Sequence, residues 1–147
     1  WRIDTLDSDF IEFKEFPDQK ISGLIPEDTA FYMVRKKDGL PSYHLASLVD
    51  DLHFGVDLVV RGKDLLSSTY AQLDLEKILG ENRFSNSYFF HHSIIKASDQ
   101  TKLSKSEGAT SIQFLRKEGK KLSDIKEMIR LMAKNLDHLA EFSEFVF

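Results

Sequence analysis

The 147-residue sequence contains no cysteine, which excludes disulfide frameworks and zinc sites built from thiolates. It also lacks any apolar run of the about 20 residues that a membrane-spanning helix needs. The first residues do not show the basic, apolar and small-residue order of a signal peptide, so a cytoplasmic location is predicted. Because the chain starts at Trp1 and not at Met, we expect a processed or cut chain.

A strong charge of either sign is also absent, since 20 Lys and Arg stand against 24 Asp and Glu. Binding to nucleic acid through its phosphates usually leaves a basic surface, so any RNA contact is expected to be local. One basic cluster follows the middle of the chain: Lys102, Lys105, Arg116, Lys117, Lys120 and Lys121. A solvated helix surface is the alternative explanation of this cluster.

Hydrophobic residues make up 41% of the chain, which suffices for one globular core at this length. Strands are predicted at 10–16, 30–35, 56–60 and 88–95, and helices at 42–55, 67–80, 111–118 and from 123 onward. The loop between the strand at 88–95 and the helix at 111–118, residues 96–110, is polar and has no periodicity. This alternation predicts an α/β fold with a mostly parallel, doubly wound sheet and ligands at the carboxyl ends of its strands.

Several details of these elements can be predicted. Ser42 is a plausible cap of the first helix, which should stop near Gly55. The apolar run at 56–60 is typical of a strand covered on both faces. The second helix is expected to be capped by Ser67, Ser68 or Thr69 and to bury one face made of Ala71, Leu75, Ile78 and Leu79.

The polar loop contains the sharpest local pattern, KLSKS at residues 102–106, followed by Glu107, Gly108 and Ala109. Lysine ammonium groups can neutralise charge that develops on phosphate oxygens, and a loop of small residues can close over a nucleotide. The pattern predicts a triphosphate site. Five residues of this composition also occur by chance on protein surfaces. The neighbouring segments therefore determine how significant the KLSKS pattern is.

Two adjacent pairs are weaker candidates for metal binding. Asp50 and Asp51 on a helix point about 100° apart, so a solvated helix end explains them better than a magnesium site. His91 and His92 on a strand point to opposite faces, so they cannot both ligate one ion without a bulge. One of them is expected to be buried and the other exposed, and no metal site is predicted.

Three blocks occur in an order that resembles the class I glutamyl-tRNA synthetases. The KLSKS loop is similar to the KMSKS signature of class I aminoacyl-tRNA synthetases. Residues 35–46, RKKDGLPSYHLA, resemble the segment that leads into a tyrosine-bearing helix, and residues 59–69, VVRGKDLLSST, are similar to the segment that carries a glutamate-binding arginine. The match covers about residues 30–115. Within it, the sequence Asp64-Leu65-Leu66 most closely resembles that of the glutamyl-queuosine tRNA(Asp) branch.

The resemblance implies a fold, the C-terminal half of a class I Rossmann-like catalytic domain with a C-terminal helical segment. Residues 1–147 are then one partial domain. It should comprise a strand or hairpin region at 1–40, an α/β core at 41–110 that ends in the KLSKS loop, and a helical segment at 111–147.

The resemblance also implies the site residues. Tyr43, Ser47 and Arg61 would line a glutamate pocket. Lys105 and Lys102 would act in catalysis, and ATP would be bound by Lys105, Ser104, Lys102, Asp64 and Leu65. Mg²⁺ would accompany ATP, zinc is not expected in this segment, and the acceptor would be tRNA, in this branch tRNA(Asp).

Physical chemistry supports two of these roles independently. A guanidinium can hold a carboxylate with two parallel hydrogen bonds, and a phenol can mark an amino or carboxylate position. The alternatives are an ion pair of Arg61 with Asp64 and a core position for Tyr43. Ser47 stands where discriminating glutamyl enzymes often have Asn, and Leu65 implies aliphatic packing of adenine.

The sequence contains no HIGH-like His-x-Gly-His signature. We therefore expect that this chain alone does not form an adenylate, because each lost electrostatic donor costs about 3 kcal/mol of transition-state stabilisation. The leading interpretation is a fragment of a glutamate-activating, tRNA-modifying ligase. The alternatives are a truncated glutamyl-tRNA synthetase and a non-catalytic remnant that binds tRNA or a protein, and self-association through an exposed sheet edge is expected.

Overall fold

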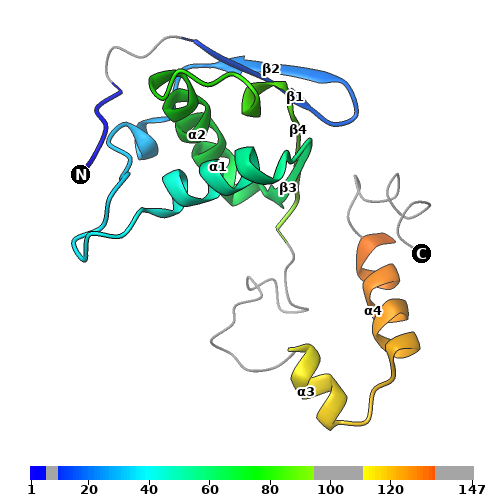
Figure 1. Ribbon diagram of the computed structural model, residues 1–147. Helices are drawn as coiled ribbons and strands as arrows, with labels where there is room; N and C mark the ends of the chain where they lie inside the picture. The colour runs from blue at the N-terminus through cyan, green and yellow to red at the C-terminus, as the bar shows by residue number, and fades with distance from the viewer. Residues whose placement is uncertain (6–9, 95–110, 135–147) are drawn as a thin grey trace. The chain divides into compact units, whose positions relative to one another are not determined.

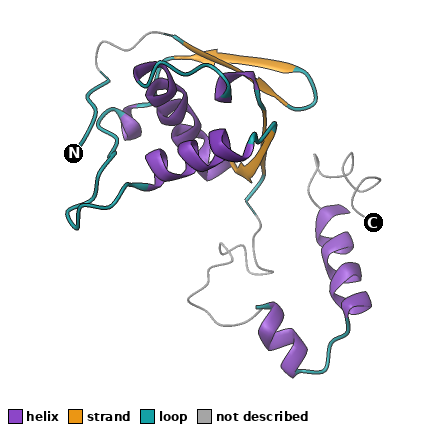
Figure 2. Cartoon of the chain, in the orientation of Figure 1, coloured by secondary structure: helices purple, strands orange, loops and turns teal. Residues whose placement is uncertain are grey.

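The computed structural model describes residues 1–5, 10–94 and 111–134, and the chain divides into two units, Trp1–His91 and His92–Phe147 (Figure 1). The four strands of the described residues lie in the first unit or at its end, and the second unit contains helices α3 (Ile112–Lys117) and α4 (Leu122–Lys134) (Figure 2). The predicted triphosphate loop at 102–106 lies outside the described residues.

The strands form a mixed four-stranded sheet in the order β2-β1-β4-β3. They are β1 (Ile11–Glu15), β2 (Gln19–Gly23), β3 (Leu58–Gly62) and β4 (Tyr88–His92). β1 pairs antiparallel with β2 and parallel with β4. The amide of Tyr88 donates to the carbonyl of Asp57 at 2.8 Å, so β3 and β4 start at the same edge. The predicted α/β class is confirmed, with β2 as an antiparallel edge strand.

Helices α1 (Tyr43–Phe54) and α2 (Leu66–Ile78) pack against each other beside this sheet (Figure 1). The core between them is strongly aromatic, and the rings of Phe13 and Phe89 meet edge to face at 5.3 Å between centroids. α1 ends at Gly55, whose φ of 65° is left-handed, as the sequence predicts. Ser42 occupies the N-cap position, but its hydroxyl donates to the carbonyl of Met33 and not back to the helix.

The predicted strand at 30–35 is wrong. This segment follows a 3₁₀ helix, η1 (Glu27–Thr29), and forms only two isolated bridges, Arg2 with Met33 and Arg35 with Pro41. Its aromatic residue Tyr32 is buried in the core instead, and the Tyr32 hydroxyl donates a hydrogen bond to Asp74 at 2.9 Å. Conversely, the strand pattern did not predict β2, although a strand or hairpin region was expected at 1–40. The residues of β2 are largely exposed, so the edge strand has no apolar alternation to reveal it.

Two predictions about β3 and α2 need correction. β3 is not covered on both faces, because Val59 is 8% exposed and Val60 is 55% exposed. α2 starts at Leu66 after a 3₁₀ turn, η2 (Lys63–Leu65), so residues 67–69 lie within the helix and do not cap it. Ala71 and Leu75 are buried as predicted, whereas Ile78 and Leu79 are exposed at the end of the helix.

The second unit contains α3 (Ile112–Lys117) and α4 (Leu122–Lys134), close to the predicted bounds. Ser111 caps α3 by accepting a hydrogen bond from the amide of Phe114 at 3.1 Å. In α4, Ile125 is buried while Ile129 is 47% exposed. No helix within the described ranges is long and apolar enough to cross a membrane.

Candidate functional site

Arg61 is the centre of the candidate site. It lies within β3, one residue before the carboxyl end of the strand, and its side chain is buried, with only 7% of the residue exposed. One guanidinium nitrogen, Nη1, donates to Oε1 of Gln72 at 2.6 Å, and the guanidinium lies 6.0 Å from the ring centre of Phe89. No ion pair between Arg61 and a carboxylate is found among the described residues.

Gln72 holds this guanidinium in place. It lies in α2 and is fully buried, its carbonyl oxygen accepts from Arg61, and its amide donates to the carbonyl of His44 at 3.4 Å. The side chain thus links β3 to the first turn of α1. Sequence reasoning missed this residue, and the available signal was a polar side chain next to Ala71 on the buried face of a helix.

Helix α1 carries two further residues of the predicted site, Tyr43 and Ser47. Tyr43 is 51% exposed, so it is not the core aromatic residue that the alternative interpretation required. Ser47 and Asp51 follow it at intervals of four residues, and the Ser47 hydroxyl donates to Oδ2 of Asp51 across 3.5 Å. Residues at this spacing lie on one face of a helix. Tyr43, Ser47 and Asp51 therefore share one face of α1, and Tyr43 and Asp51 interact electrostatically with Arg61.

Electrostatics link these side chains. Burial lowers the pKa of Arg61, while Tyr43 and Asp51 act in the opposite direction. Burial also lowers the pKa of His44, to which Arg61 contributes by repulsion. Burial raises the pKa of Asp51, while Arg61 and the hydrogen bond from Ser47 oppose this shift. The guanidinium therefore remains the cation of the site, since His44 is held in its neutral form.

Asp51 is a second residue that sequence reasoning missed. The pair Asp50-Asp51 was expected to be a solvated helix end, and Asp50 is indeed exposed. Asp51 is partly buried and interacts electrostatically with Arg61, so the expectation is wrong for this residue. Helical periodicity places Asp51 on the same face as Tyr43, eight residues later, but its interaction with Arg61 depends on the packing of α1 beside β3.

His91 serves the scaffold. Its ring nitrogen Nδ1 lies 2.7 Å from Oε2 of Glu15, its amide donates to Oε1 of the same carboxylate at 2.6 Å, and Nε2 lies 2.8 Å from the hydroxyl of Thr69. These contacts join β4 to β1 and to α2. His91 is buried and His92 is partly exposed, so the two side chains differ in burial as the strand pattern predicts.

The predicted ATP residues fall into two groups. Asp64 and Leu65 lie in η2, directly after the strand that carries Arg61, with Asp64 exposed and Leu65 partly buried. Lys102, Ser104 and Lys105 lie outside the described residues. No group of three or more His, Asp or Glu side chains within the described ranges could hold a metal ion.

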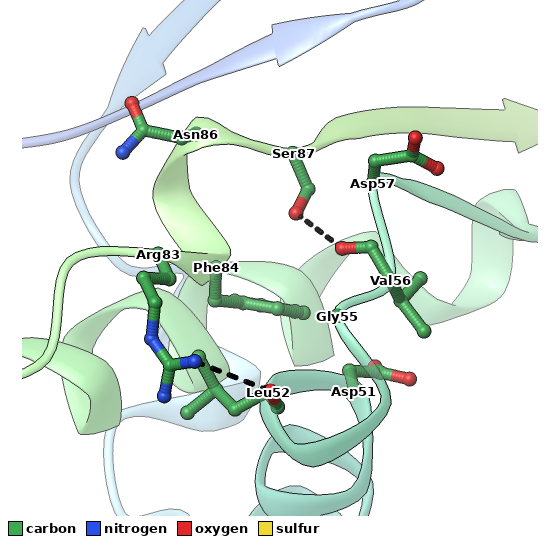
Figure 3. A pocket seen from close by; sticks show the side chains of 9 residues that line it. All are labelled: Asp51, Leu52, Gly55, Val56, Asp57, Arg83, Phe84, Asn86 and Ser87. Carbon is green, nitrogen blue, oxygen red and sulfur yellow. Dashed lines mark hydrogen bonds between the residues drawn. The ribbon is translucent and has the colours of Figure 1, made fainter.

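A cavity of about 240 Å³ lies at the other end of β3 (Figure 3). Its walls include Asp57 and Ser87, which directly precede β3 and β4, and Asp51 and Leu52 at the end of α1. Two polar side chains of the wall bond to backbone carbonyls: Ser87 donates to the carbonyl of Val56 at 2.8 Å, and Arg83 donates to the carbonyl of Leu52 at 3.5 Å. Ligands of parallel sheets bind at the carboxyl ends of strands, which is where Arg61 lies.

Comparison with known proteins identifies the family of this chain. Residues 16–145 match the family described as tRNA synthetases class I (E and Q), catalytic domain. A glutamate–tRNA ligase of Carboxydothermus hydrogenoformans is 39% identical over 88 residues, 60% of this chain and 18% of the relative. A glutamate–tRNA ligase of Chlamydia trachomatis serovar L2 is 37% identical over 102 residues, 69% of this chain and 20% of the relative.

Solved structures give the same result. The glutamate-tRNA synthetase of Elizabethkingia anophelis superposes with a TM-score of 0.53 at 29% identity, covering 68% of this chain and 20% of that one. A glutamate tRNA ligase from Elizabethkingia meningosepticum, solved in complex with its amino acid, gives a TM-score of 0.51 at 29% identity, covering 68% of this chain and 19% of that one. The chain spans about a fifth of the length of the curated relatives it matches. The chain therefore belongs to the class I tRNA synthetase (E and Q) family and forms part of its catalytic domain.

Proposed function

We propose that this chain forms the amino-acid-binding part of a ligase that activates glutamate with ATP and transfers it to tRNA. The observation that carries the proposal is the buried Arg61 guanidinium, whose hydrogen bond among the described residues goes to a neutral amide. A buried cation is costly unless a negative charge and further hydrogen bonds compensate it. A substrate carboxylate would supply both, because it can accept two parallel bonds from a guanidinium.

Glutamate suits this arrangement because it carries two carboxylates. In the proposed binding mode, Arg61 holds the side-chain carboxylate, with Tyr43 and Ser47 on the facing wall. The α-carboxylate is then free to react. The similarity to proteins named glutamate–tRNA ligases supports this choice of substrate.

In the proposed reaction an oxygen of the α-carboxylate attacks the α-phosphorus of ATP. The bond to the leaving pyrophosphate breaks, which gives glutamyl adenylate. A hydroxyl of the acceptor RNA then attacks the glutamyl carbonyl, and AMP leaves. Lys102, Ser104 and Lys105 are proposed to contact ATP phosphates, Asp64 and Leu65 to lie beside the nucleoside, and magnesium to enter as the Mg–ATP substrate.

We propose queuosine of tRNA(Asp) as the acceptor. The sequence Asp64-Leu65-Leu66, which follows Arg61, supports this choice because it resembles that of the queuosine branch. The alternative acceptor is tRNA(Glu), as in a glutamyl-tRNA synthetase, and the names of the relatives support that alternative. Transfer of labelled glutamate to tRNA(Asp) with and without queuosine, beside tRNA(Glu), distinguishes the two.

The proposal is tested by glutamate-dependent exchange of pyrophosphate into ATP. The assay compares the 147-residue chain with the same chain extended by its flanking coding sequence. Exchange by the extended chain, reduced about tenfold or more by Arg61→Lys, is the expected result, because an ammonium cannot form the paired hydrogen bonds of a guanidinium. No exchange by either form with any amino acid would favour a non-catalytic binding protein.

A further inference from the structure

The segment before α1 forms a turn that also holds Trp1 in place (Figure 1). The amide of Val34 donates to the carbonyl of Trp1 at 3.0 Å. The amide of Lys36 donates to the carbonyl of Leu40 at 2.9 Å, which closes a turn over residues 36–40. The backbone of Trp1 is therefore fixed to the segment that leads into α1.

The indole of Trp1 lies on the surface although its backbone is fixed. Trp1 is 80% exposed, and the guanidinium of Arg35 lies 5.4 Å from the centre of its ring. This guanidinium is itself held, because its Nε donates to the carbonyl of Gly39 at 3.0 Å. The indole thus has a positioned cation on one face and leaves the other face accessible to a ligand.

The same turn is positively charged. Three consecutive residues, Arg35, Lys36 and Lys37, are basic and exposed, and Asp38 is the one carboxylate at positions 35–40. Asp38 is engaged within the turn, since its Oδ2 lies 3.6 Å from Nζ of Lys36 and its Oδ1 accepts from the amide of Leu40 at 3.0 Å. The turn therefore concentrates positive charge in a chain whose net charge is −4.

An exposed ring beside a basic turn fits single-stranded nucleic acid. Bases stack on aromatic rings, and cations contact the phosphates between them. A duplex keeps its base faces covered, and an acidic peptide would use the charges but not the indole. The amide of Ser42 donates to the carbonyl of Val34 at 2.9 Å, and Tyr43 starts α1 directly afterwards. RNA on this surface would therefore lie next to the helix start that carries Tyr43.

We propose that the surface formed by Trp1, Arg35, Lys36 and Lys37 binds a single-stranded segment of the acceptor RNA. One base stacks on the indole of Trp1, and the basic side chains contact the phosphates that flank it. The inference rests on the proposed function, because it assigns a surface to the RNA acceptor of that reaction.

The test uses the fluorescence of Trp1, which is the single tryptophan of the chain. The 147-residue chain is titrated with an unstructured RNA of about 12 nucleotides, with the duplex of the same RNA and with polyglutamate. The single strand should quench the fluorescence and bind more tightly than the other two. Trp1→Ala should weaken binding of the fluorescein-labelled strand about tenfold, measured by anisotropy. Lys37→Gln should reduce the slope of log Kd against log salt concentration by about 0.7.

Two variants are matched controls that should leave RNA binding unchanged. Phe54→Ala removes an aromatic residue that is 76% exposed at the end of α1, and Lys20→Gln removes an exposed lysine of β2. Urea unfolding of each variant separates lost binding from lost folding.

RNA binding without quenching, or wild-type affinity in Trp1→Ala, would refute this surface. Equal affinity for the duplex would refute base stacking, and stronger binding of polyglutamate would assign the surface to an acidic peptide. Glutamate-dependent pyrophosphate exchange needs no RNA in the proposed reaction, so it tests the proposed function separately. Exchange without RNA binding would contradict the inference alone, and RNA binding without exchange would contradict the proposed function alone.

Discussion

At the scale of single residues, Gln72 decides what Arg61 can bind. A neutral amide fixes the guanidinium by one hydrogen bond of 2.6 Å, and no carboxylate among the described residues forms an ion pair with it. A glutamate side chain at this position would have nearly the same shape and would carry the missing charge. A substitution of Gln72 by Glu would therefore place a carboxylate of the protein against Arg61, where the substrate carboxylate is proposed to bind.

We predict that Gln72→Glu weakens glutamate binding about tenfold or more, because an internal ion pair with Arg61 competes with the substrate carboxylate. Folding should be retained, since the buried charge gains a partner. Gln72→Met, which keeps the volume and removes both hydrogen bonds, should cost about 1–3 kcal/mol of unfolding free energy. Calorimetry and urea unfolding measure the two effects, and unchanged binding in Gln72→Glu would contradict the role of Arg61.

The stability of the chain should also depend on Asp51. Burial raises the pKa of its carboxyl group above the usual 3.8 in the folded state, so the folded state binds this proton more tightly than the unfolded state. The ionised carboxylate therefore opposes folding once the pH rises through the folded pKa. Asp51→Asn removes this effect. It should stabilise the protein near pH 7 and have no such effect below pH about 3.8.

Urea unfolding of Asp51→Asn against wild type at both pH values checks this expectation. Asp50→Asn is again the control, because Asp50 is exposed and should give no comparable difference. A gain in Asp51→Asn that is equal at both pH values would show that titration of this carboxyl is not its cause.

At the scale of elements, a buried carboxylate joins α2 to the turn before β4. Glu76 is 1% exposed, and its two oxygens accept from the amides of Phe84 at 2.5 Å and Ser85 at 3.0 Å. These amides start the 3₁₀ turn η3 (Phe84–Asn86), which has no side-chain cap of its own. Glu76 thus positions the turn that leads into β4.

Glu76→Gln should cost about 1–3 kcal/mol of unfolding free energy, because an amide has one acceptor oxygen and leaves one buried N–H without its partner. Glu81→Gln, at an exposed position of the same region, should change stability by less than about 0.5 kcal/mol. Urea unfolding compares the two variants. Equal stability of wild type and Glu76→Gln would mean that η3 is held by other contacts.

The elements also show what the sequence could and could not predict. Periodicity and turn residues predicted α1, α3, β1 and β4, because each has a clear local pattern. β2 was missed and a strand at 30–35 was wrongly expected, because strand pairing depends on partners elsewhere in the chain. The family-like segments at 35–46 and 59–69 predicted Arg61 and Tyr43 as site residues. Gln72 and Asp51 acquire their interactions with Arg61 only when α1 and α2 pack beside β3.

At the scale of the whole molecule, β3 is the last strand of the sheet among the described strands. Its Val60 is 55% exposed, and an open strand edge with apolar residues is a site for pairing with another chain. We therefore keep the prediction that the chain associates with itself through this edge. Val60→Lys should reduce that association, because charged residues protect strand edges.

Sedimentation velocity across a range of protein concentrations measures this association. Lys14→Ala is the control, because it changes a charge on β1, an inner strand of the sheet. The wild type and the control should gain mass with concentration and Val60→Lys should not. A wild-type chain that remains monomeric at every concentration would contradict the prediction.

The central claim is that Arg61 and the polar face of α1 bind glutamate. Titration of the ¹⁵N-labelled chain with L-glutamate, followed by amide chemical shifts, tests it most directly. We predict saturable shifts in residues 43–47 and 61–62 of the wild type. These shifts should be weaker in Tyr43→Phe, whose half-exposed position leaves the fold intact, and absent in Arg61→Gln. Shifts confined to the cavity at Asp57 and Ser87, or no shifts at any concentration, would contradict the account.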